Sequence, residues 1–260
     1  MNISVIIPTY NRAGLILKAI QSVQKQSSKI KEIIVIDDGS TDGTKDILKN
    51  ENITYIYQEN KGVSKARNRG ILLAKYDWLA FLDSDDIWDE DKIKEHIFLH
   101  TNNNNILASF TSEKWVRNGK TIKLKAHQKK EEPSFLNSLA LCKIGVSTFF
   151  CHKKIFNDIG LFDENLKVCE DYDLWLRILL KYNIKLIDKP LTTKFAGHKN
   201  QLSFDTPLID TYRIEALRKH INSKYNDEII EEIKNKKSIL LKGAKKHNNQ
   251  DIINYYENKV

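Results

Sequence analysis

Cysteine is scarce in this chain, and the few that occur form no recognisable pair. The 260 residues contain three cysteines, Cys142, Cys151 and Cys169. Their number is odd and no two of them have CxxC spacing, so a disulfide framework is not indicated. We therefore expect all three to be free thiols in a reducing cytosol.

Long apolar runs are also missing. No stretch of about 20 consecutive apolar residues is present, which argues against a transmembrane helix. The opening residues MNISVIIPTYNR lack the basic region of a signal peptide, and Pro8 ends their apolar run early. We expect a cytoplasmic protein, with peripheral contact at the inner face of the cell membrane as an open alternative.

Several common functional motifs are absent. His96 and His100 have i,i+4 spacing, but no glutamate follows His96 as the zinc-protease motif HExxH requires, so we expect both on a solvated helix face. The glycines fit neither GxGxxG nor a P-loop. The net charge of +8 comes without zinc-finger spacing or an aromatic RNA-binding motif. We expect no nucleic acid partner, and consider phosphorylated small molecules or an anionic membrane surface instead.

The residues that are present describe an α/β protein. The composition, 41% hydrophobic and 29% charged, is typical of a globular chain with a sizeable core. In the first hundred residues, short β-rich runs alternate with helical periodicity. The predicted strands are ISVIIPTY, KEIIVIDD, NITYIYQ and YDWLAFLDSDD, and the predicted helices are RAGLILKAIQSVQKQ, STDGTKDILKN, GVSKARNRGILLAK and WDEDKIKEHIFLHT. This alternation predicts βαβ units and a mostly parallel central sheet flanked by helices.

The remainder of the chain is less regular. The pair Asn118-Gly119 predicts a hairpin, SFLNSLALC a short helix and VSTFFCHK a strand. CEDYDLWLRILLKYN has clear helical periodicity, and IKLIDKPLTTKFAGH is typical of an extended segment. Beyond Pro207 the pattern is helical and highly charged. We therefore predict a main domain at residues 1–206 and a C-terminal helical extension at residues 207–260.

Polar clusters follow three of the predicted strands. They are PTYNR after the first strand, DDGS after the second and DSDD after the fourth. Ligands of parallel α/β sheets bind at the carboxyl ends of the strands, so the three clusters together indicate a site. We also expect Ser40 or Thr41 of the second cluster to cap the helix that follows.

The densest cluster is FLDSDD, in which Asp83, Asp85 and Asp86 follow a buried strand. Carboxylates this close repel one another unless a cation lies among them. Carboxylate oxygens suit Mg²⁺ or Mn²⁺, which one or two protein carboxylates commonly hold together with substrate phosphates. The alternative is a solvated strand end whose aspartates cap the next helix. If the strand stays extended, Asp83 and Asp85 point to the same side.

Two later segments carry further candidates. Glu170 and Asp171 of CEDYD begin a helix, where carboxylates are favoured in any case. One of them could act as a general base if that helix lies over the carboxyl edge of the sheet. His198, on the polar segment GHKNQLS, is either a metal ligand or an ordinary surface residue.

Four segments together resemble a known family. SVIIPTYNR, IIVIDDGSTDGT, GVSKARNRGI and WLAFLDSDD are similar, in order and spacing, to the family-2 glycosyltransferases of the Rossmann-like GT-A fold. EDYDLWLRI resembles the later acidic motif of that family, and the resemblance covers residues 3–195. It implies transfer of a hexosyl- or N-acetylhexosaminyl-type sugar from a nucleotide diphosphate donor to an acceptor hydroxyl, with inversion at the anomeric carbon. It also implies a bacterial role in building surface glycans such as lipopolysaccharide or capsule.

The resemblance implies the donor contacts. Pro8, Thr9 and Tyr10 would border the nucleotide, Asp38 would contact its base, and Arg67 would lie near the donor. A UDP-sugar is favoured because an aspartate facing the base suits the uracil imide, while dTDP- and GDP-sugars stay open.

The resemblance also implies the catalytic roles. DSD matches the DxD motif, so Asp85 would hold Mn²⁺ or Mg²⁺ on the diphosphate, and Asp83 would contact the ribose or a metal-bound water. Asp171 would be the catalytic base, supported by Glu170, and His198 is a further candidate for the metal.

Other functions and partners stay open at this point. A metal-dependent nucleotidyltransferase or phosphohydrolase also needs carboxylates at strand ends, and a non-catalytic nucleotide-sugar-binding protein would keep the same pocket. The expected acceptor is a growing surface glycan, lipid-linked acceptors included. The basic C-terminal helices could form a homodimer, rest on an anionic membrane, or be ordinary solvated helices.

Overall fold

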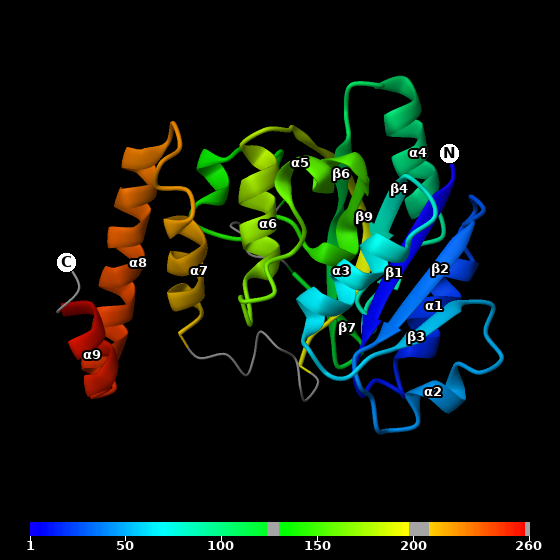
Figure 1. Ribbon diagram of the computed structural model, residues 1–260, viewed down its shortest axis with the longest axis horizontal. Helices are drawn as coiled ribbons and strands as arrows, with labels where there is room; N and C mark the ends of the chain where they lie inside the picture. Colours follow the sequence, from blue (N-terminus) through cyan, green and yellow to red (C-terminus); the bar gives the residue numbers. More distant parts are fainter. Residues whose placement is uncertain (124–129, 198–207, 258–260) are drawn as a thin grey trace.

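A computed structural model describes residues 1–123, 130–197 and 208–257 of the chain. Across these residues one nine-stranded sheet has the strand order β3-β2-β1-β4-β8-β6-β9-β5, with β7 paired to β6. Helices lie on both sides of this sheet (Figure 1). The α/β prediction is therefore confirmed.

The first four strands are parallel neighbours, as their alternation with helices predicts. The strands are β1 Ile3–Thr9, β2 Glu32–Asp37, β3 Thr54–Tyr57 and β4 Trp78–Phe81. The helices between them are α1 Ile16–Gln24, α2 Thr44–Ile47 and α3 Val63–Leu73. Every residue of β1 is buried, because packed layers cover both faces of a central parallel strand.

The second half of the sheet is mixed. Its elements are β5 Ile87–Trp88, α4 Lys92–Asn102, β6 Ala108–Arg117, β7 Lys120–Ile122, β8 Phe149–His152, α5 Lys154–Ile159, α6 Glu170–Leu179 and β9 Ile184–Phe195. β8 runs antiparallel between β4 and β6, and β5 is antiparallel to β9. β6 and β9 are parallel. The sheet is thus parallel over β1 to β4 and mixed beyond them.

The hairpin prediction is confirmed. Asn118 and Gly119 connect β6 to β7, and both have positive φ angles, 50° and 75°. This is the conformation that an Asn-Gly hairpin turn requires. The segment SFLNSLALC, by contrast, forms only the 3₁₀ turn Leu136–Ser138.

The predicted capping of the second helix is wrong. α2 is a single turn, and its N-terminal flank is Gly43 with a φ of 86°. Asp42 satisfies the helix start instead, since its Oδ1 accepts a hydrogen bond from the Thr44 backbone N–H at 3.1 Å. The Ser40 hydroxyl instead accepts a hydrogen bond from the Asn11 backbone N–H.

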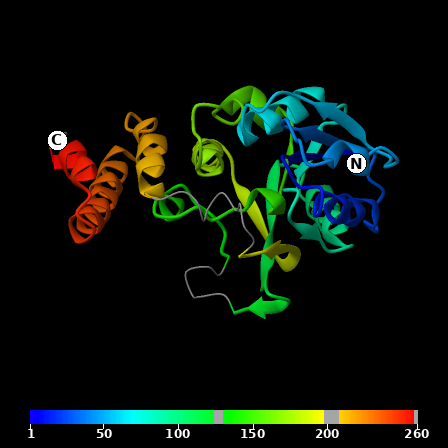
Figure 2. The ribbon, with the colours of Figure 1, turned by 90° about the horizontal axis from the view of Figure 1, so that it is seen from below.

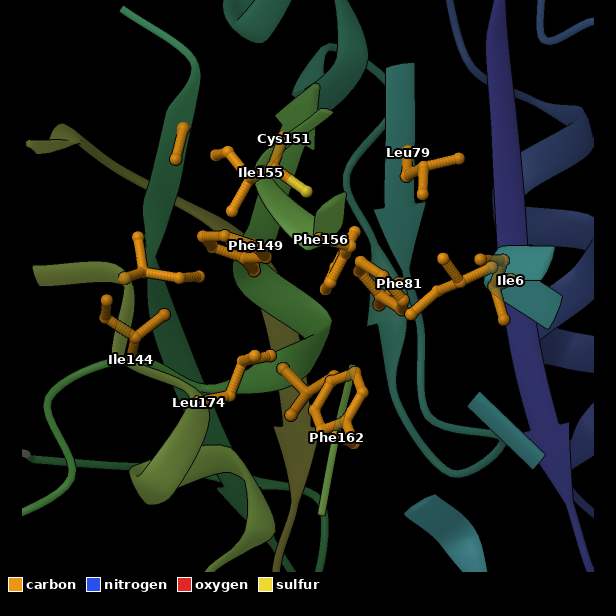
Figure 3. Close-up of a cluster of buried hydrophobic side chains, with 14 of the residues drawn as sticks. Ile6, Leu79, Phe81, Ile144, Phe149, Cys151, Ile155, Phe156, Phe162 and Leu174 are labelled. Carbon is orange, nitrogen blue, oxygen red and sulfur yellow. The ribbon is translucent and has the colours of Figure 1, made fainter. Parts of the chain in front are cut away.

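Two hydrophobic clusters fill the space between the sheet and its helices. Strand alternation divides β1 between them, with Ile6 in one cluster and Val5 and Ile7 in the other. Phe81 and Phe149 lie in the first cluster (Figure 3). This cluster also includes side chains from α3, α5 and α6. A fully buried side chain of this size stabilises the fold by about 1.5–3 kcal/mol. This packing fixes α3 and α6, which both carry site residues, against the same face of the sheet.

The expectation of a solvated face on α4 is wrong. His96 and His100 are 0% and 3% exposed. Their ring nitrogens lie 2.7 and 2.8 Å from the Ser109 hydroxyl of β6. Lys92, one turn earlier, is also buried, and its Nζ donates to the Thr148 carbonyl at 2.9 Å. A polar helix face can be buried where the neighbouring strand supplies hydrogen-bond partners.

The described residues 208–257 are mainly helical, as the sequence pattern predicts. Its helices are α7 Ile209–Arg218, α8 Asn226–Lys246 and α9 Gln250–Glu257. They lie beside α6, at the end of the molecule farthest from β2 and β3 (Figures 1 and 2). A third hydrophobic cluster joins Tyr172 and Leu176 of α6 to Leu217 and Ile229 of these helices. None of the described helices is long and apolar enough to span a membrane.

Candidate active site

The loops that follow β1 and β2 are joined to each other. The Asn11 backbone N–H donates to Ser40 Oγ at 2.8 Å. Of the residues expected to border a nucleotide, Pro8 and Thr9 are buried at the end of β1, and Tyr10 is 46% exposed. Thr9 Oγ1 is buried without a hydrogen-bond partner among the described residues. The two loops therefore form one wall at the carboxyl edge of the sheet, with the Tyr10 ring accessible.

Asp38 fixes the segment between β3 and α3. Its Oδ1 accepts hydrogen bonds from Gln58 Nε2 at 2.7 Å and from the Lys61 N–H at 2.9 Å. Its Oδ2 accepts one from the Gly62 N–H at 2.8 Å. Gly62 has a φ of 91°, a conformation that glycine adopts readily and residues with a side chain rarely do. Asp38 thus holds the segment before α3 at this edge of the sheet. Its contact with a nucleotide base stays a prediction.

The acidic segment after β4 is a tight turn. β4 ends at Phe81, and the Asp86 N–H donates to the Asp83 carbonyl at 3.0 Å. The Asp83 N–H in turn donates to Ser147 Oγ at 3.0 Å. The strand does not stay extended, so the alternation that would place Asp83 and Asp85 on the same side does not apply.

Arg67 connects the acidic turn to the start of α6. Its guanidinium is buried and donates to Asp83 Oδ1 at 2.8 Å and to Glu170 Oε1 at 2.6 Å. Burial alone would lower the pKa of Arg67, but the two carboxylates raise it. Arg67 likewise lowers the pKa of Asp83 against the opposing effect of burial. A permanent positive charge therefore lies between the two acidic motifs.

Lys194 of β9 is a second cation at this site. Its Nζ lies 3.6 Å from Asp86 Oδ2. Burial lowers the pKa of Lys194, but the carboxylates of Asp86 and Glu113 raise it by more, so the net shift is upward. Burial raises the pKa of Asp86 to about 7, although Lys194 opposes this shift. Lys194 and Arg67 are thus positive side chains of the protein itself, and they compensate the repulsion among the carboxylates.

Asp171 lies at the first turn of α6 and is partly buried. Its Oδ1 accepts a hydrogen bond from the Tyr172 N–H at 2.7 Å, and its Oδ2 lies 3.5 Å from Cys142 Sγ. Glu170, the preceding residue, is the one that Arg67 holds. The helix start therefore lies over the carboxyl edge of the sheet, which is the condition that a general base at Asp171 requires.

A groove of about 310 Å³ opens beside the acidic turn. Asp85 and Asp86 line one side of it. Leu15, Val116 and Phe195 supply apolar lining from the approach to α1, from β6 and from β9. Asp85 is therefore accessible to a ligand from outside the turn.

The carboxylates of the turn suit part of a divalent metal site. The Asp83 side chain is 26% exposed, and Asp85 faces the groove. Two carboxylates completed by phosphate oxygens and water are a common arrangement for Mg²⁺. Among the described residues no group of three or more His, Cys, Asp or Glu side chains is assembled for a metal. His198, the third expected ligand, lies outside the described residues.

Several residues of the site have no signal in the sequence. Lys194 and Glu113 belong to no motif. They lie near each other because β9 pairs with β6, where Lys194 is opposite Trp115, two residues after Glu113. The prediction that Cys142 is a free thiol is confirmed, but no sequence pattern indicates its contact with Asp171.

Comparison with known proteins identifies the family. The profile of Glycosyl transferase family 2 matches residues 4–159, which is more than half of the chain. An uncharacterized glycosyltransferase of Rickettsia felis is 37% identical over 203 residues, covering 76% of this chain and 34% of the relative. The chain therefore spans about a third of the length of that relative.

Two further relatives match over more of their own length. The Escherichia coli protein named UDP-Glc:alpha-D-GlcNAc-diphosphoundecaprenol beta-1,3-glucosyltransferase WfgD is 34% identical over 191 residues, covering 72% of this chain and 73% of WfgD. The crystal structure of S. aureus TarS 1-349 in complex with UDP-GlcNAc has a TM-score of 0.73 at 25% identity, covering 91% of this chain and 72% of that chain. The expected GT-A fold is confirmed, and the chain belongs to glycosyl transferase family 2.

Proposed function

We propose that this chain is an inverting glycosyltransferase that moves a sugar from a nucleoside diphosphate donor to a hydroxyl group of a glycan acceptor. The observation that carries the proposal is the Arg67 bridge, which brings the DxD turn and the acidic start of α6 into one site. Arg67 and Glu170 are 103 residues apart in the chain, so their contact is a property of the folded molecule.

We infer that the donor is a UDP-sugar and that the acceptor is a surface glycan built on a lipid diphosphate. The name of WfgD specifies UDP-Glc and a diphosphoundecaprenol-linked GlcNAc, and the TarS structure contains UDP-GlcNAc. In this chain the nucleotide would lie along the joined loops after β1 and β2, beside Tyr10 and Asp38. The net charge of +8 favours binding of both anionic substrates.

The base in this proposal is Asp171. Its carboxylate would take the proton of the acceptor hydroxyl as that oxygen attacks the anomeric carbon. Glu170 is held by Arg67, so it supports the helix start and leaves Asp171 as the carboxylate that can reach a substrate. One base and one leaving group suffice for a single displacement, which inverts the anomeric carbon.

Asp85, with Asp83, would hold Mn²⁺ or Mg²⁺ at the donor diphosphate. When bound, this ion neutralises negative charge on the leaving nucleoside diphosphate. Arg67 and Lys194 keep the neighbouring carboxylates from repelling one another, so that Asp85 stays oriented towards the groove.

A donor screen tests this proposal. Nucleoside diphosphate release would be measured for a panel of nucleotide sugars, with Mn²⁺ or with EDTA, using GlcNAc attached through a diphosphate to a short lipid as acceptor. We expect metal-dependent release with a UDP-sugar, and a loss of about 100-fold or more in Asp85→Ala and in Asp171→Asn. Asp89→Ala, which alters an exposed aspartate just outside the turn, should keep the wild-type rate.

The other outcomes separate the alternative functions. Release of nucleoside monophosphate or inorganic phosphate would favour a nucleotidyltransferase or phosphohydrolase. Calorimetric binding of a UDP-sugar without any turnover would favour a binding protein. Binding of no nucleotide sugar at all would contradict the proposal, and an axial-to-equatorial change seen by NMR in the product would establish inversion.

A further inference from the structure

The segment 139–144 is fixed to α6 through its backbone carbonyls. Tyr172 Oη donates to the Leu139 carbonyl at 2.5 Å, and Trp175 Nε1 donates to the Ile144 carbonyl at 2.9 Å. Both donor side chains are almost fully buried. The segment is neither helix nor strand, so these side chains supply the partners that its backbone would otherwise lack.

Helix α8 provides another anchor for the same segment. Lys236 Nζ donates to the Ala140 carbonyl at 2.8 Å, although Lys236 is only 3% exposed. Glu232 at 3.0 Å and Asp210 at 3.6 Å compensate the charge of its ammonium group. A buried ammonium group is costly unless it is paired and hydrogen-bonded. The C-terminal helices therefore hold the segment through a specific polar contact in addition to their apolar packing.

The middle of the segment touches the base. Cys142 Sγ lies 3.5 Å from Asp171 Oδ2 and 3.3 Å from the Ile144 carbonyl. Burial, reinforced by the Asp171 carboxylate, raises the pKa of the Cys142 thiol well above its ordinary value. The thiol therefore keeps its proton and shares it between two acceptors, the Ile144 carbonyl and Asp171 Oδ2, while the Tyr172 N–H donates to Oδ1. Both oxygens of the base are thus oriented by the protein.

We propose that the segment 139–144 is a bracket that sets the orientation of the Asp171 carboxylate, with Cys142 and Lys236 as positioning residues. The inference rests on the proposed function, because it takes Asp171 as the base. A thiol is a weak hydrogen-bond donor, so it orients a carboxylate without neutralising it. The C-terminal helices then contribute indirectly to the reaction, because α8 fixes the bracket and the bracket orients Asp171.

Cysteine variants test the bracket directly. We expect Cys142→Ala to lower kcat about tenfold, with the KM for the donor within about twofold of wild type, because a misplaced base affects the chemical step more than donor binding. Cys142→Ser keeps a donor at this position and should restore kcat to within about threefold of wild type. Cys151→Ala is the matched control, since Cys151 is a buried cysteine of β8 in the hydrophobic core.

A lysine pair tests the contribution of α8. Lys236→Met keeps the aliphatic stem and removes the ammonium group, so we expect a fall in kcat similar to that of Cys142→Ala. Lys242→Met changes an exposed lysine of the same helix and should keep wild-type kcat. Circular dichroism of every variant checks folding, and if Lys236→Met does not fold, the cysteine variants decide.

Asp171→Asn, measured alongside, tests the assignment of the base separately from the bracket. Wild-type turnover in Asp171→Asn would overturn the assignment of the base and the bracket with it. Loss of turnover in Asp171→Asn together with wild-type kcat in Cys142→Ala would overturn the bracket alone. An equal fall in kcat for Cys142→Ala and Cys142→Ser would also contradict it, because the serine hydroxyl can still donate.

Discussion

At the scale of single residues, Arg67 determines how the two acidic motifs relate to each other. Its forked guanidinium reaches Asp83 and Glu170 at once, at 2.8 and 2.6 Å. A lysine ammonium is a point charge without this planar fork, so it could not reproduce both contacts in the same geometry. The identity of this side chain is therefore as important as its charge.

Replacing Arg67 by methionine should destabilise the protein and abolish sugar transfer. Removing one partner of a buried ion pair leaves uncompensated charge, which costs about 3–5 kcal/mol of unfolding free energy. Urea unfolding followed by circular dichroism measures this loss. Arg69→Met, on the same helix, removes an arginine that contacts the Tyr57 carbonyl and Gln58, and it should cost less and leave activity intact. Equal losses for the two variants would contradict the central role of Arg67.

At the scale of secondary structure, the elements that could be predicted are those with an uninterrupted period. The strands ending at Thr9 and Phe81 and the helix that follows Cys169 all have strong apolar patterns, and they lie where the sequence predicts them. The parallel arrangement then placed their polar ends at one edge. The buried polar face of α4 could not be predicted. A row of polar residues at helical spacing looks identical in the sequence whether its hydrogen-bond partners are water molecules or hydroxyl groups of a neighbouring strand.

The buried row on α4 makes stability depend on pH. Burial, with the nearby Lys92, lowers the pKa of His96 well below its ordinary value, so the folded state keeps this ring neutral. The unfolded chain takes up the proton below about pH 6.5. The unfolded state then binds more protons, and the unfolding free energy falls as pH drops from 6.5, by up to about 1.4 kcal/mol per pH unit for this group.

Urea unfolding at pH 7, 6 and 5 checks this prediction. Wild type should lose about 1–2 kcal/mol more between pH 7 and pH 5 than His96→Gln does, because glutamine cannot take up the proton. His247→Gln alters an exposed histidine and should follow the wild-type curve. Parallel curves for wild type and His96→Gln would show that His96 does not govern the acid sensitivity.

At the scale of the whole molecule, the C-terminal helices share a core with α6, the helix that carries the proposed base. Tyr172 and Leu176 pack against Leu217 and Ile229, and Lys219 of the extension pairs with the buried Asp173 at 2.6 Å. The division at residue 207 came from a change in composition, which cannot reveal contacts across the boundary. Packing of this kind predicts one cooperative unit rather than two independent ones.

Equilibrium unfolding tests this cooperativity. All four tryptophans, Trp78, Trp88, Trp115 and Trp175, precede the extension, whereas α8 contributes strongly to the helical signal in circular dichroism. We expect tryptophan fluorescence and far-ultraviolet circular dichroism to give coincident transitions in urea. A helical transition at lower urea than the fluorescence transition would mean that the extension unfolds on its own.

The separation of Arg67 from Glu170 has a consequence for how the molecule is made. The ribosome adds about 5–20 residues per second, so the 103 residues between them take about 5–20 s to synthesise. Early in this interval Asp83 joins Arg67 in the nascent chain, together with the last of the strands β1 to β4 that place them. Glu170 and Asp171 can join only after this interval, and the bracket later still, because Lys236 of α8 must be synthesised before it can hold the Ala140 carbonyl. The part of the site that is proposed to bind the nucleotide can therefore take shape on the ribosome before the part that is proposed to receive the acceptor.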